Sequence, residues 1–405
     1  MTATVTLADI RAAADRVAGR VLRSPCPRSI PLSEVVAADV FCKLDLLQRT
    51  GSFKERGACN ALLQLDAAAR SRGVVAASAG NHALGLSYHG RLLGIPVTVV
   101  MPRFAPLVKV ATCRRLGARV ILEGETFDDA RRLAGEIAVR DGLDRIHGFD
   151  DPRVIAGQGT MGLEILEDLP NVDAIVVPTG GAGLLAGVAV AAKSLRPEIR
   201  VVAVDTAAAP SFSASLAAGH PVAVPIRPTL ADGLAVGRVG DLPFALAAPL
   251  VDRVVTVDEA EVSLAVLRLL ELEKTVVEGA AATALAAVMG DRCPELAGKR
   301  IVLLLCGGNI DLTILDRVID HGLVADGRRW RFTARISDRP GGIARLTAAI
   351  AQAGASVREV VHDRAFSGAD VFSTAVEVTV ETAGHEHVAA LAAALAAEGF
   401  EVRGT

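Results

Sequence analysis

Short apolar segments alternate with helical patterns between about residue 40 and residue 320. Most of these segments are apolar without alternation, which is typical of parallel strands that are buried on both faces. The clearest predicted strands are Val40–Leu44, Val74–Ser78, Val97–Met101, Arg119–Leu122, Ala174–Pro178, Val201–Asp205, Arg253–Val257 and Ile301–Cys306. The alternation predicts a doubly wound α/β fold, which binds ligands at the carboxyl ends of its strands. An amphipathic helix is predicted ahead of it, over Leu7–Val21.

A second pattern follows a change in composition near residues 321–329. It has the order strand, helix, strand, strand, helix, strand, which is the ferredoxin-like α+β unit. The predicted elements are the strands Trp330–Ile336, Ser356–Asp363, Val371–Val380 and Phe400–Val402 and the helices Ile343–Ala353 and His385–Glu398. We expect a main domain over residues 1–322 with a smaller lobe at about 45–150 inside it, a linker over 323–329, and a small domain over 330–405.

Composition narrows the class of protein. The chain has 405 residues, of which 51% are apolar, and a net charge of −3. This length supports domains with their own cores, and the small charge gives no reason to expect nucleic acid or an anionic membrane as a partner. The apolar runs are too short to span a bilayer, no signal peptide is visible, and the six cysteines form no Cys-x-x-Cys pair. We expect a cytoplasmic protein with reduced thiols and no metal site.

Lys54 is the first candidate for chemistry. It follows a Gly-Ser corner and Phe53, and it lies one turn into a predicted helix. The positive end of a helix discourages protonation of an amine, which makes the amine a better nucleophile. The alternative is an ordinary surface lysine in a first helical turn, and this stretch alone does not decide between the two.

A strand-to-helix turn is the second candidate, and it consists of Ser78, Ala79, Gly80, Asn81 and His82. We expect Ser78 to cap the helix that follows. The free backbone N–H groups of Gly80, Asn81 and His82 then form a site for an anion such as a carboxylate. The alternative is a plain turn with a serine cap, and such turns are common.

A glycine-rich turn after a buried strand is the third candidate. It consists of Gly180, Gly181, Ala182, Gly183 and Leu184. Small residues let backbone N–H groups close around a phosphate at the start of a helix. The sequence therefore predicts a phosphate site at this turn.

The same stretch has a second interpretation. Gly181, Gly183 and Gly187 resemble a dinucleotide fingerprint, and Asp205 ends the next strand, where a ribose-binding acid would stand. The third glycine is one residue out of place, however, and a dinucleotide turn usually opens its domain. A nicotinamide-dependent dehydrogenase is therefore kept only as an alternative.

The fourth candidate is Cys306, which is followed by Gly307, Gly308 and Asn309 after a strongly apolar strand. By itself this is a core cysteine before a tight turn. A thiol at this strand end would nevertheless face the same crevice as the other three candidates, because parallel strands end at one edge of the sheet.

Together these four stretches resemble the fold-type II pyridoxal-phosphate enzymes, and specifically the threonine and serine dehydratases among them. The matching sequences are Gln-Arg-Thr-Gly-Ser-Phe-Lys at 48–54, Ser-Ala-Gly-Asn-His at 78–82, Gly-Gly-Ala-Gly-Leu at 180–184 and Cys-Gly-Gly-Asn at 306–309, with lesser matches at 149–151, 157–160 and 231–233. The tail, with Asp-Arg-Pro-Gly-Gly at 338–342 and His-Asp-Arg at 362–364, looks like an ACT domain. The pairing is similar to short-form threonine ammonia-lyases.

The resemblance implies a role for each candidate residue. Lys54 would hold pyridoxal phosphate as a Schiff base and then act as the general base at the substrate Cα. Asn81 would bond the cofactor's 3-hydroxyl, and Cys306 would face its pyridine nitrogen. The backbone of residues 180–184 would hold the phosphate, and the turn of residues 78–82 would hold the substrate carboxylate. The implied cofactor-binding residues are Phe53, Lys54, Asn81, Gly180, Gly181, Ala182, Gly183, Leu184 and Cys306.

The reaction implied by the resemblance is the deamination of L-threonine to 2-oxobutanoate and ammonia, by β-elimination of water. A thiol at Cys306 would not supply a proton to the ring nitrogen as a carboxylic acid does, which favours prompt loss of the β-hydroxyl. The cofactor phosphate is the expected acid for that hydroxyl.

Three departures from the family pattern bear on strain, racemisation and metal binding. Ala182 replaces a glycine of the phosphate turn, so its φ must stay negative or its backbone is strained. Ala79 cannot act as the second base of the related serine racemases, which disfavours racemisation. Ser211 stands where a second acid would join Asp205 around a divalent cation, so we expect weak or no metal binding.

Other expectations concern the substrate and the tail. Leu84, where threonine enzymes often carry Gln, and Cys306, where they often carry Ser, motivate an alternative substrate: L-serine or another 3-hydroxy amino acid. A non-catalytic amino-acid sensor is disfavoured, because every candidate position is intact. The resemblance implies an amino-acid effector around Asp338–Ile343 and Ser356, with isoleucine or valine suiting a biosynthetic enzyme, and a homodimer or homotetramer. The alternative is a tail that only mediates assembly.

Overall fold

The computed structural model describes residues 4–290, 292–362 and 372–404. It divides into two compact units, Met1–Asp311 and Leu312–Thr405. Helix α14 (Leu312–Ala325) runs without a break to the turn before strand β11 (Arg329–Ser337). The predicted linker over 323–329 therefore falls on the end of a helix and the start of a strand, and the predicted division after residue 322 falls inside α14. That the chain divides into a catalytic domain and a regulatory domain stays a prediction.

The main sheet of the first unit has six strands in the order β1-β2-β10-β7-β8-β9. All neighbours are parallel except β1, which runs antiparallel to β2. The strands are β1 (Arg28–Ser29), β2 (Asp39–Lys43), β7 (Ala174–Pro178), β8 (Arg200–Thr206), β9 (Arg253–Val257) and β10 (Arg300–Leu304). The parallel strands match the predicted ones, and the two-residue strand β1 was not predicted.

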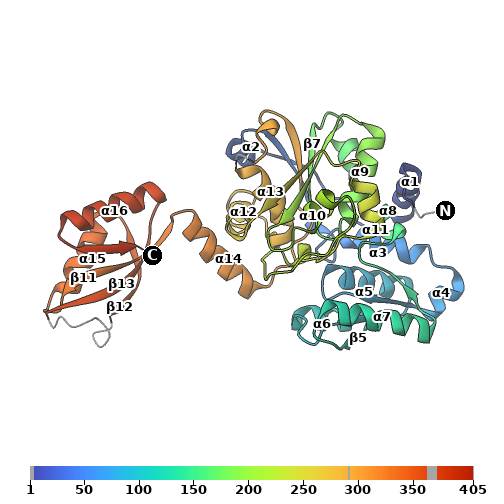
Figure 1. Cartoon of the computed structure of the whole chain (residues 1–405), viewed down its shortest axis with the longest axis horizontal. Helices are drawn as coiled ribbons and strands as arrows, with labels where there is room; N and C mark the ends of the chain where they lie inside the picture. The colour runs from blue at the N-terminus through green and yellow to red at the C-terminus, as the bar shows by residue number, and fades with distance from the viewer. Residues whose placement is uncertain (1–3, 291, 363–371, 405) are drawn as a thin grey trace. The chain divides into compact units, whose positions relative to one another are not determined.

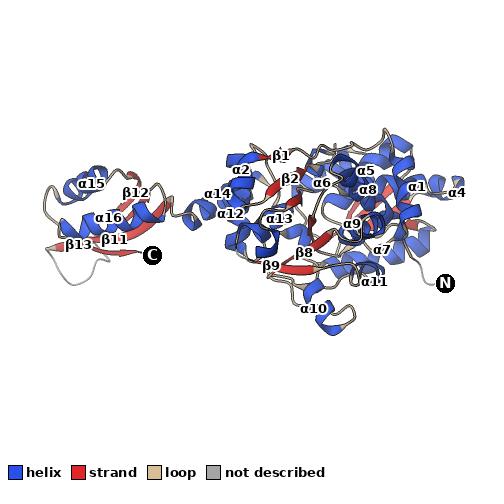
Figure 2. Cartoon of the chain, turned by 90° about the horizontal axis from the view of Figure 1, so that it is seen from above, coloured by secondary structure: helices blue, strands red, loops and turns tan. Residues whose placement is uncertain are grey.

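Helices lie on both sides of this sheet (Figures 1 and 2). Those on one side are α2 (Ile30–Val36), α12 (Glu259–Leu272) and α13 (Gly279–Met289). Those on the other side are α1 (Leu7–Val17), α8 (Pro152–Asp168) and α9 (Gly183–Leu195). The first unit also contains α4 (Ala67–Arg72), α10 (Ser211–Ala218) and α11 (Asp241–Ala247). Coverage on both faces explains why the strands are apolar throughout.

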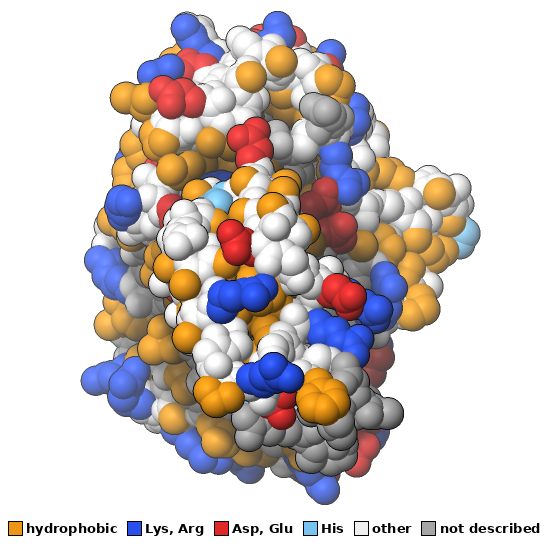
Figure 3. Space-filling model, turned by 90° about the vertical axis from the view of Figure 1, so that its left-hand side faces the viewer, with side chains coloured by type: hydrophobic (Ala, Val, Ile, Leu, Met, Phe, Trp, Pro, Cys, Tyr) orange, Lys and Arg blue, Asp and Glu red, His pale blue; other side chains and the backbone are white. Residues whose placement is uncertain are grey.

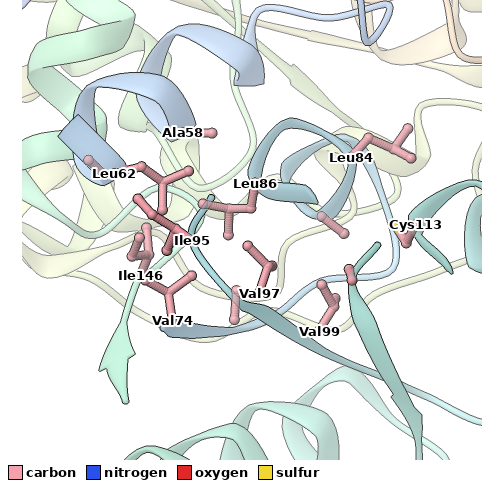
Figure 4. Close-up of a cluster of buried hydrophobic side chains, with 14 of the residues drawn as sticks. Ala58, Leu62, Val74, Leu84, Leu86, Ile95, Val97, Val99, Cys113 and Ile146 are labelled. Carbon is pink, nitrogen blue, oxygen red and sulfur yellow. The ribbon is translucent and has the colours of Figure 1, made fainter. Parts of the chain in front are cut away.

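A smaller parallel sheet, in the order β5-β4-β3-β6, forms the lobe predicted at about 45–150. Its strands are β3 (Val74–Ala77), β4 (Val97–Met101), β5 (Arg119–Leu122) and β6 (Asp144–Arg145), and its helices are α3 (Lys54–Leu63), α5 (Asn81–Leu93), α6 (Leu107–Arg115) and α7 (Phe127–Asp141). Successive residues of β3 enter two cores. Val74 joins Leu62 and Leu86 in one cluster (Figure 4), and Val75 joins Ile137 of α7 in the other.

Three glycines in α8 let the neighbouring helices approach closely. A Cβ at Gly157 would lie 2.7 Å from Cα of Gly57 in α3, and a Cβ at Gly159 would lie 2.9 Å from the carbonyl O of Gly187 in α9. A Cβ at Gly162 would lie 2.9 Å from the methyl group of Ala191. Real side chains do not fit at these distances, so α8 connects the helix that begins with Lys54 to the helix that follows the glycine-rich turn.

The second unit has the predicted β-α-β-β-α-β order. Its four strands form an antiparallel sheet in the order β12-β13-β11-β14. Its elements after β11 are α15 (Gly342–Gln352), β12 (Ser356–His362), β13 (Ser373–Glu381), α16 (His385–Ala397) and β14 (Glu401–Gly404). Alternate strand residues such as Phe332 and Val378 pack with Leu346 and Leu391 of the helices. Residues 363–371, which include parts of two predicted strands and most of the His-Asp-Arg match, lie outside the described residues.

The surface carries charges of both signs. Figure 3 shows Lys and Arg side chains interspersed with Asp, Glu and hydrophobic side chains on the face turned to the viewer. Among the described residues, no helix is long and apolar enough to cross a membrane.

Two glycine substitutions of the same kind should have opposite effects on stability. Gly157→Ala forces α3 and α8 apart and should lower the free energy of unfolding by about 1–3 kcal/mol. In α7, a Cβ at Gly135 would meet only Nη1 of Arg145, at 3.8 Å. Gly135→Ala should therefore raise the free energy of unfolding by about 0.5–1 kcal/mol, because alanine is the better helix former. Urea unfolding measures both, and shifts in the same direction would contradict the close packing of α8.

Candidate active site

Lys54 is the first residue of α3 rather than lying one turn into the helix. Its Nζ donates to the carbonyl O of Gly148 at 2.6 Å and lies 5.1 Å from the centre of the Phe53 ring. Burial lowers the pKa of Lys54 from 10.5 to about 8. The lowered pKa is thus caused mainly by the loss of water around the amine. The sequence had suggested a different cause, the positive end of the helix. An ordinary surface lysine does not describe this residue.

The loop that leads into Lys54 is held against the turn after β10. The N–H of Phe53 donates to the carbonyl O of Cys306 at 2.9 Å, and the N–H of Gly308 donates to the carbonyl O of Gly51 at 2.9 Å. These bonds join two segments that are far apart in the sequence. They bring the first and fourth candidate stretches together at the carboxyl ends of the strands.

The Cys306 thiol is neutral. Cys306 is 3% exposed, and burial raises the pKa of its thiol well above the ordinary value of 9.0. A neutral thiol is a weak hydrogen-bonding group and not a proton source at neutral pH.

The turn of residues 78–82 differs from prediction in its cap. Helix α5 begins at Asn81 with Gly80 as its N-cap, and no side chain caps it. The hydroxyl of Ser78 instead accepts from the N–H of Gly80 at 3.3 Å. This bond occupies one of the three N–H groups that were predicted to bind an anion. Within the described residues, the N–H groups of Asn81 and His82 donate to no other group.

His82 is a buried, neutral side chain. Its Nε2 lies 3.3 Å from the carbonyl O of Ile146, and a Cβ at Gly148 would lie 3.3 Å from Cδ2 of the ring, so the ring packs next to Gly148. Burial, and to a lesser extent the charge of Lys54, lowers the pKa of His82 to about 3. His82 therefore does not carry a proton at neutral pH, and its ring supports the backbone that accepts from Lys54.

The glycine-rich turn opens helix α9, and Ala182 is the N-cap. Within the part of the chain that the structure describes, the N–H groups of residues 181–184 donate to no other group. Free N–H groups at a helix start bind anions. The φ of Ala182 is +66°, so the backbone takes the strained conformation that the sequence left open, at a cost of about 1–2 kcal/mol.

Phe149 fixes the glycines of this turn. A Cβ at Gly181 would lie 2.3 Å from the Phe149 ring, and a Cβ at Gly183 would lie 2.7 Å from the carbonyl O of Phe149. On another side, a Cβ at Gly180 would lie 3.0 Å from the carbonyl O of Gly233. The turn thus packs against the residue next to Gly148, which accepts from Lys54.

Asn81 belongs to a hydrogen-bonded chain that includes a residue the sequence reasoning missed. Its Oδ1 accepts from Nδ2 of Asn309, and its Nδ2 donates to the carboxyl group of Glu278. Glu278 is the only charged residue in the stretch of residues 275–290, and it directly precedes the apolar helix of residues 279–289. An acid directly ahead of an apolar helix was the available signal in the sequence, but nothing local connects it to Asn81.

A buried cluster of charges anchors the start of α3. The guanidinium of Arg56 donates to both oxygens of Asp45 at 2.8 and 2.7 Å and to both oxygens of Glu164 at 2.6 and 2.8 Å. Nζ of Lys43 donates to Glu164 at 2.6 Å. Burial by itself would raise the pKa of Asp45, but Arg56 holds it below its ordinary value. The cluster ties α3, two residues after Lys54, to the main sheet and to α8.

The dinucleotide interpretation finds no support in the geometry. A Cβ at Gly187 would lie 2.5 Å from the carbonyl O of Ile155, so this glycine serves helix packing. Asp205 accepts from the N–H and the hydroxyl of Ser213, both at 2.8 Å. Within the described residues, no three His, Cys, Asp or Glu side chains gather in a way that would hold a metal ion.

The geometry agrees with comparison to known proteins. The family model described as pyridoxal-phosphate dependent enzyme matches residues 17–307. The chain belongs to the pyridoxal-phosphate dependent enzymes. An L-threonine ammonia-lyase of Thermotoga maritima is 46% identical and covers 98% of this chain and 99% of its own length. The nicotinamide alternative is therefore wrong.

Two solved structures share the fold. The processed form of threonine deaminase isoform 2 from Solanum lycopersicum has a TM-score of 0.73 and 36% identity, covering 78% of this chain and 92% of its own. Maize serine racemase has a TM-score of 0.75 and 34% identity, covering 80% of this chain and 99% of its own. The predicted fold-type II architecture is thus confirmed.

The residues of the site fit pyridoxal phosphate, which is the family's cofactor. An amine of lowered pKa suits its aldehyde, and free N–H groups at the start of α9 suit a phosphate. The amide of Asn81 offers a donor, and the thiol of Cys306 offers a neutral neighbour. The glycines at 180, 181 and 183 leave no side chain in the way of these groups.

Lys54 should react as an amine with a pKa of about 8. Acylation of the cofactor-free protein over a pH series, followed by peptide mass spectrometry, should give a labelling midpoint of about pH 8 for this residue. A lysine peptide labelled in the same mixture should have its midpoint at about 10.4. Coincident midpoints would show that the amine is hydrated and would contradict the burial described here.

Proposed function

We propose that this chain is an L-threonine ammonia-lyase, which deaminates L-threonine to 2-oxobutanoate and ammonia with pyridoxal phosphate. The observation that carries the proposal is the position of the Lys54 amine, which has a pKa of about 8 and is enclosed by the turns that hold Gly148, Cys306 and Asn81. Similarity to the Thermotoga maritima L-threonine ammonia-lyase over nearly the whole chain supports the choice of reaction.

Lys54 is proposed to hold the cofactor covalently and, once released, to take the proton from the substrate Cα. Its lowered pKa supports both roles, because about a tenth of the amine is unprotonated at pH 7, far more than for an ordinary lysine. The carbonyl O of Gly148 accepts from Nζ at 2.6 Å and so fixes the direction of the amine. When bound, pyridoxal phosphate supplies an electron sink for the charge left by proton removal.

The backbone and the neutral side chains are proposed to orient the ligands. The free N–H groups of residues 181–184 would hold the cofactor phosphate, and those of Asn81 and His82 the substrate carboxylate. Phe53 would lie beside the cofactor, and the thiol of Cys306 would face its ring nitrogen. Because that thiol stays protonated, it leaves the ring a moderate sink, which favours elimination over lasting carbanions.

The alternative substrate is L-serine or another 3-hydroxy amino acid. The structural similarity to maize serine racemase supports L-serine as the second candidate substrate. Leu84 is 7% exposed and packs in the core of the small lobe, so it offers no polar group to a substrate. Ala79 likewise has no hydroxyl to act as a second base, so we propose elimination rather than racemisation.

The second unit is proposed to be an ACT domain that binds an amino-acid effector, such as isoleucine or valine in a biosynthetic role. Its β-α-β-β-α-β order supports this. The proposed ligand region is Asp338–Ile343, where α15 begins, together with Ser356 at the start of β12. We also propose a cytoplasmic homodimer or homotetramer. Phe104, Leu107 and Val108, which lie close together in the chain at the start of α6 and are exposed, support association between copies.

A substrate panel tests the proposed function. Purified full-length protein loaded with pyridoxal phosphate should release 2-oxobutanoate from L-threonine with a higher kcat/KM than it releases keto acid from L-serine or 3-hydroxyaspartate. The Lys54→Arg variant should have a kcat at least about a thousandfold lower, because Lys54 removes the Cα proton of the substrate. Lys299→Arg, at an exposed lysine, is the matched control. A higher kcat/KM for L-serine than for L-threonine would show that serine is the substrate and would contradict the proposal.

An amino-acid titration tests the tail. Isoleucine or valine should shift the melting temperature of the full-length protein, or change how its reaction rate depends on threonine concentration, because a ligand stabilises the state that binds it. If no amino acid changes either quantity, the tail serves assembly alone.

A further inference from the structure

Glu278 is a buried acid that the proposed reaction leaves unused. It is 5% exposed, and its two carboxyl oxygens lie 2.9 and 3.2 Å from Nδ2 of Asn81. Its N–H donates to the carbonyl O of Gly307 at 3.0 Å. A Cβ at Gly307 would lie 2.1 Å from Oε1 of Glu278, so position 307 is a glycine because the carboxyl group fills the space of a side chain.

The carboxyl group does not serve the helix that it precedes. Glu278 is the N-cap of α13, yet its side chain accepts no N–H of the first helical turn. Burial, with a smaller contribution from the charge of Asp232, raises the pKa of Glu278 to about 7. Besides bonding Asn81, the carboxyl group accepts from the backbone N–H of Asn309 in the turn after β10. A buried acid that caps no helix and bonds two segments of the site is typical of a functional site.

The hydrogen bonds around Asn81 leave its amide one orientation. Nδ2 of Asn309 donates to the carbonyl O of Thr50 at 2.7 Å and to Oδ1 of Asn81 at 2.9 Å. A backbone carbonyl can only accept, so the group of Asn309 that faces Thr50 must be its amide NH₂. One hydrogen of this NH₂ bonds Thr50 and the other points at Asn81, so Asn81 must present its side-chain oxygen to Asn309. Nδ2 of Asn81 then faces Glu278. One of its hydrogens bonds the carboxyl group, and the other remains for a ligand.

We propose that Glu278 is a positioning residue that acts through Asn81: its carboxyl group holds the amide so that the remaining N–H is presented to the ring hydroxyl of pyridoxal phosphate. Thr50 fixes one end of the chain of amides and Glu278 fixes the other. If the acceptor at position 278 is removed, the Asn81 amide keeps only the bond that its Oδ1 accepts from Asn309. The amide can then turn about that bond, so the remaining N–H is no longer held toward the cofactor. The inference rests on the proposed function, since it assumes that Asn81 meets the cofactor.

The test compares variants of the full-length protein by their affinity for pyridoxal phosphate and by the absorption maximum of the bound cofactor. Glu278→Met keeps the length of the side chain and removes the acceptor, so it should weaken cofactor binding about tenfold or more and shift the maximum. Glu278→Gln keeps one acceptor oxygen, so its cofactor affinity and absorption maximum should lie between those of Glu278→Met and those of the parent protein. Asp205→Asn, at a buried acid of raised pKa that accepts from Ser213, is the control and should change neither quantity.

A double-mutant cycle separates positioning from a general structural role. In an Asn81→Ala background, Glu278→Met should cause no further loss of cofactor affinity, because the group it acts through is gone. Additive losses, or a Glu278→Met protein with the parent's affinity and spectrum, would overturn the proposal.

Gly307→Ala provides a second route if Glu278→Met does not fold. It displaces the carboxyl group from Asn81 and should reproduce the weaker binding, and unchanged binding would likewise overturn the proposal. Failure of the parent protein to bind pyridoxal phosphate would instead refute the proposed function, so the two failures are distinguishable.

Discussion

The first unit depends on the buried guanidinium of Arg56, which bonds both oxygens of Asp45 and both oxygens of Glu164. Each charge would be costly in the interior by itself, and each is tolerable only because the others are in place. Asp45 follows strand β2, and Glu164 lies in α8, so one side chain connects the main sheet, the small lobe and the central helix. Lys54 precedes Arg56 by two residues, and its amine is therefore placed by a constraint that the reaction never touches.

The site carries part of the conformational cost of the first unit. Ala182 adopts a left-handed backbone where glycine would be relaxed, and Glu278 keeps a carboxyl group away from water. Among the described residues, the buried oxygens Oγ1 of Thr50 and Oγ of Ser52 have no hydrogen-bond partner, and both lie in the loop before Lys54. Such groups also occur elsewhere, for example at Asp205 and Ser211. Those before Lys54 lie where a strained backbone and a buried acid are also found, and this combination is typical of a site shaped for ligands rather than for stability.

Local pattern predicted most of the fold and long-range contact decided the rest. Buried parallel strands such as β4 and β7 were found at their observed residues, because a short, unbroken apolar run between turn residues is typical of a strand covered on both faces. Strands of two residues, such as β1, leave no periodic signal. The glycines and Lys54 were found through motif spacing. The bond from Ser78 to Gly80, the φ of Ala182 and the approach of Glu278 to Asn81 depend on how the folded chain packs around them, so no local pattern reveals them.

The central claim is that pyridoxal phosphate is bound covalently by one amine of the chain. Borohydride reduction of the protein with its cofactor, followed by proteolysis and mass spectrometry, locates that bond directly. The account predicts a single modified peptide, with the added mass of the reduced cofactor on Lys54. A modification at another lysine, or a protein that remains unmodified at saturating cofactor, would contradict it.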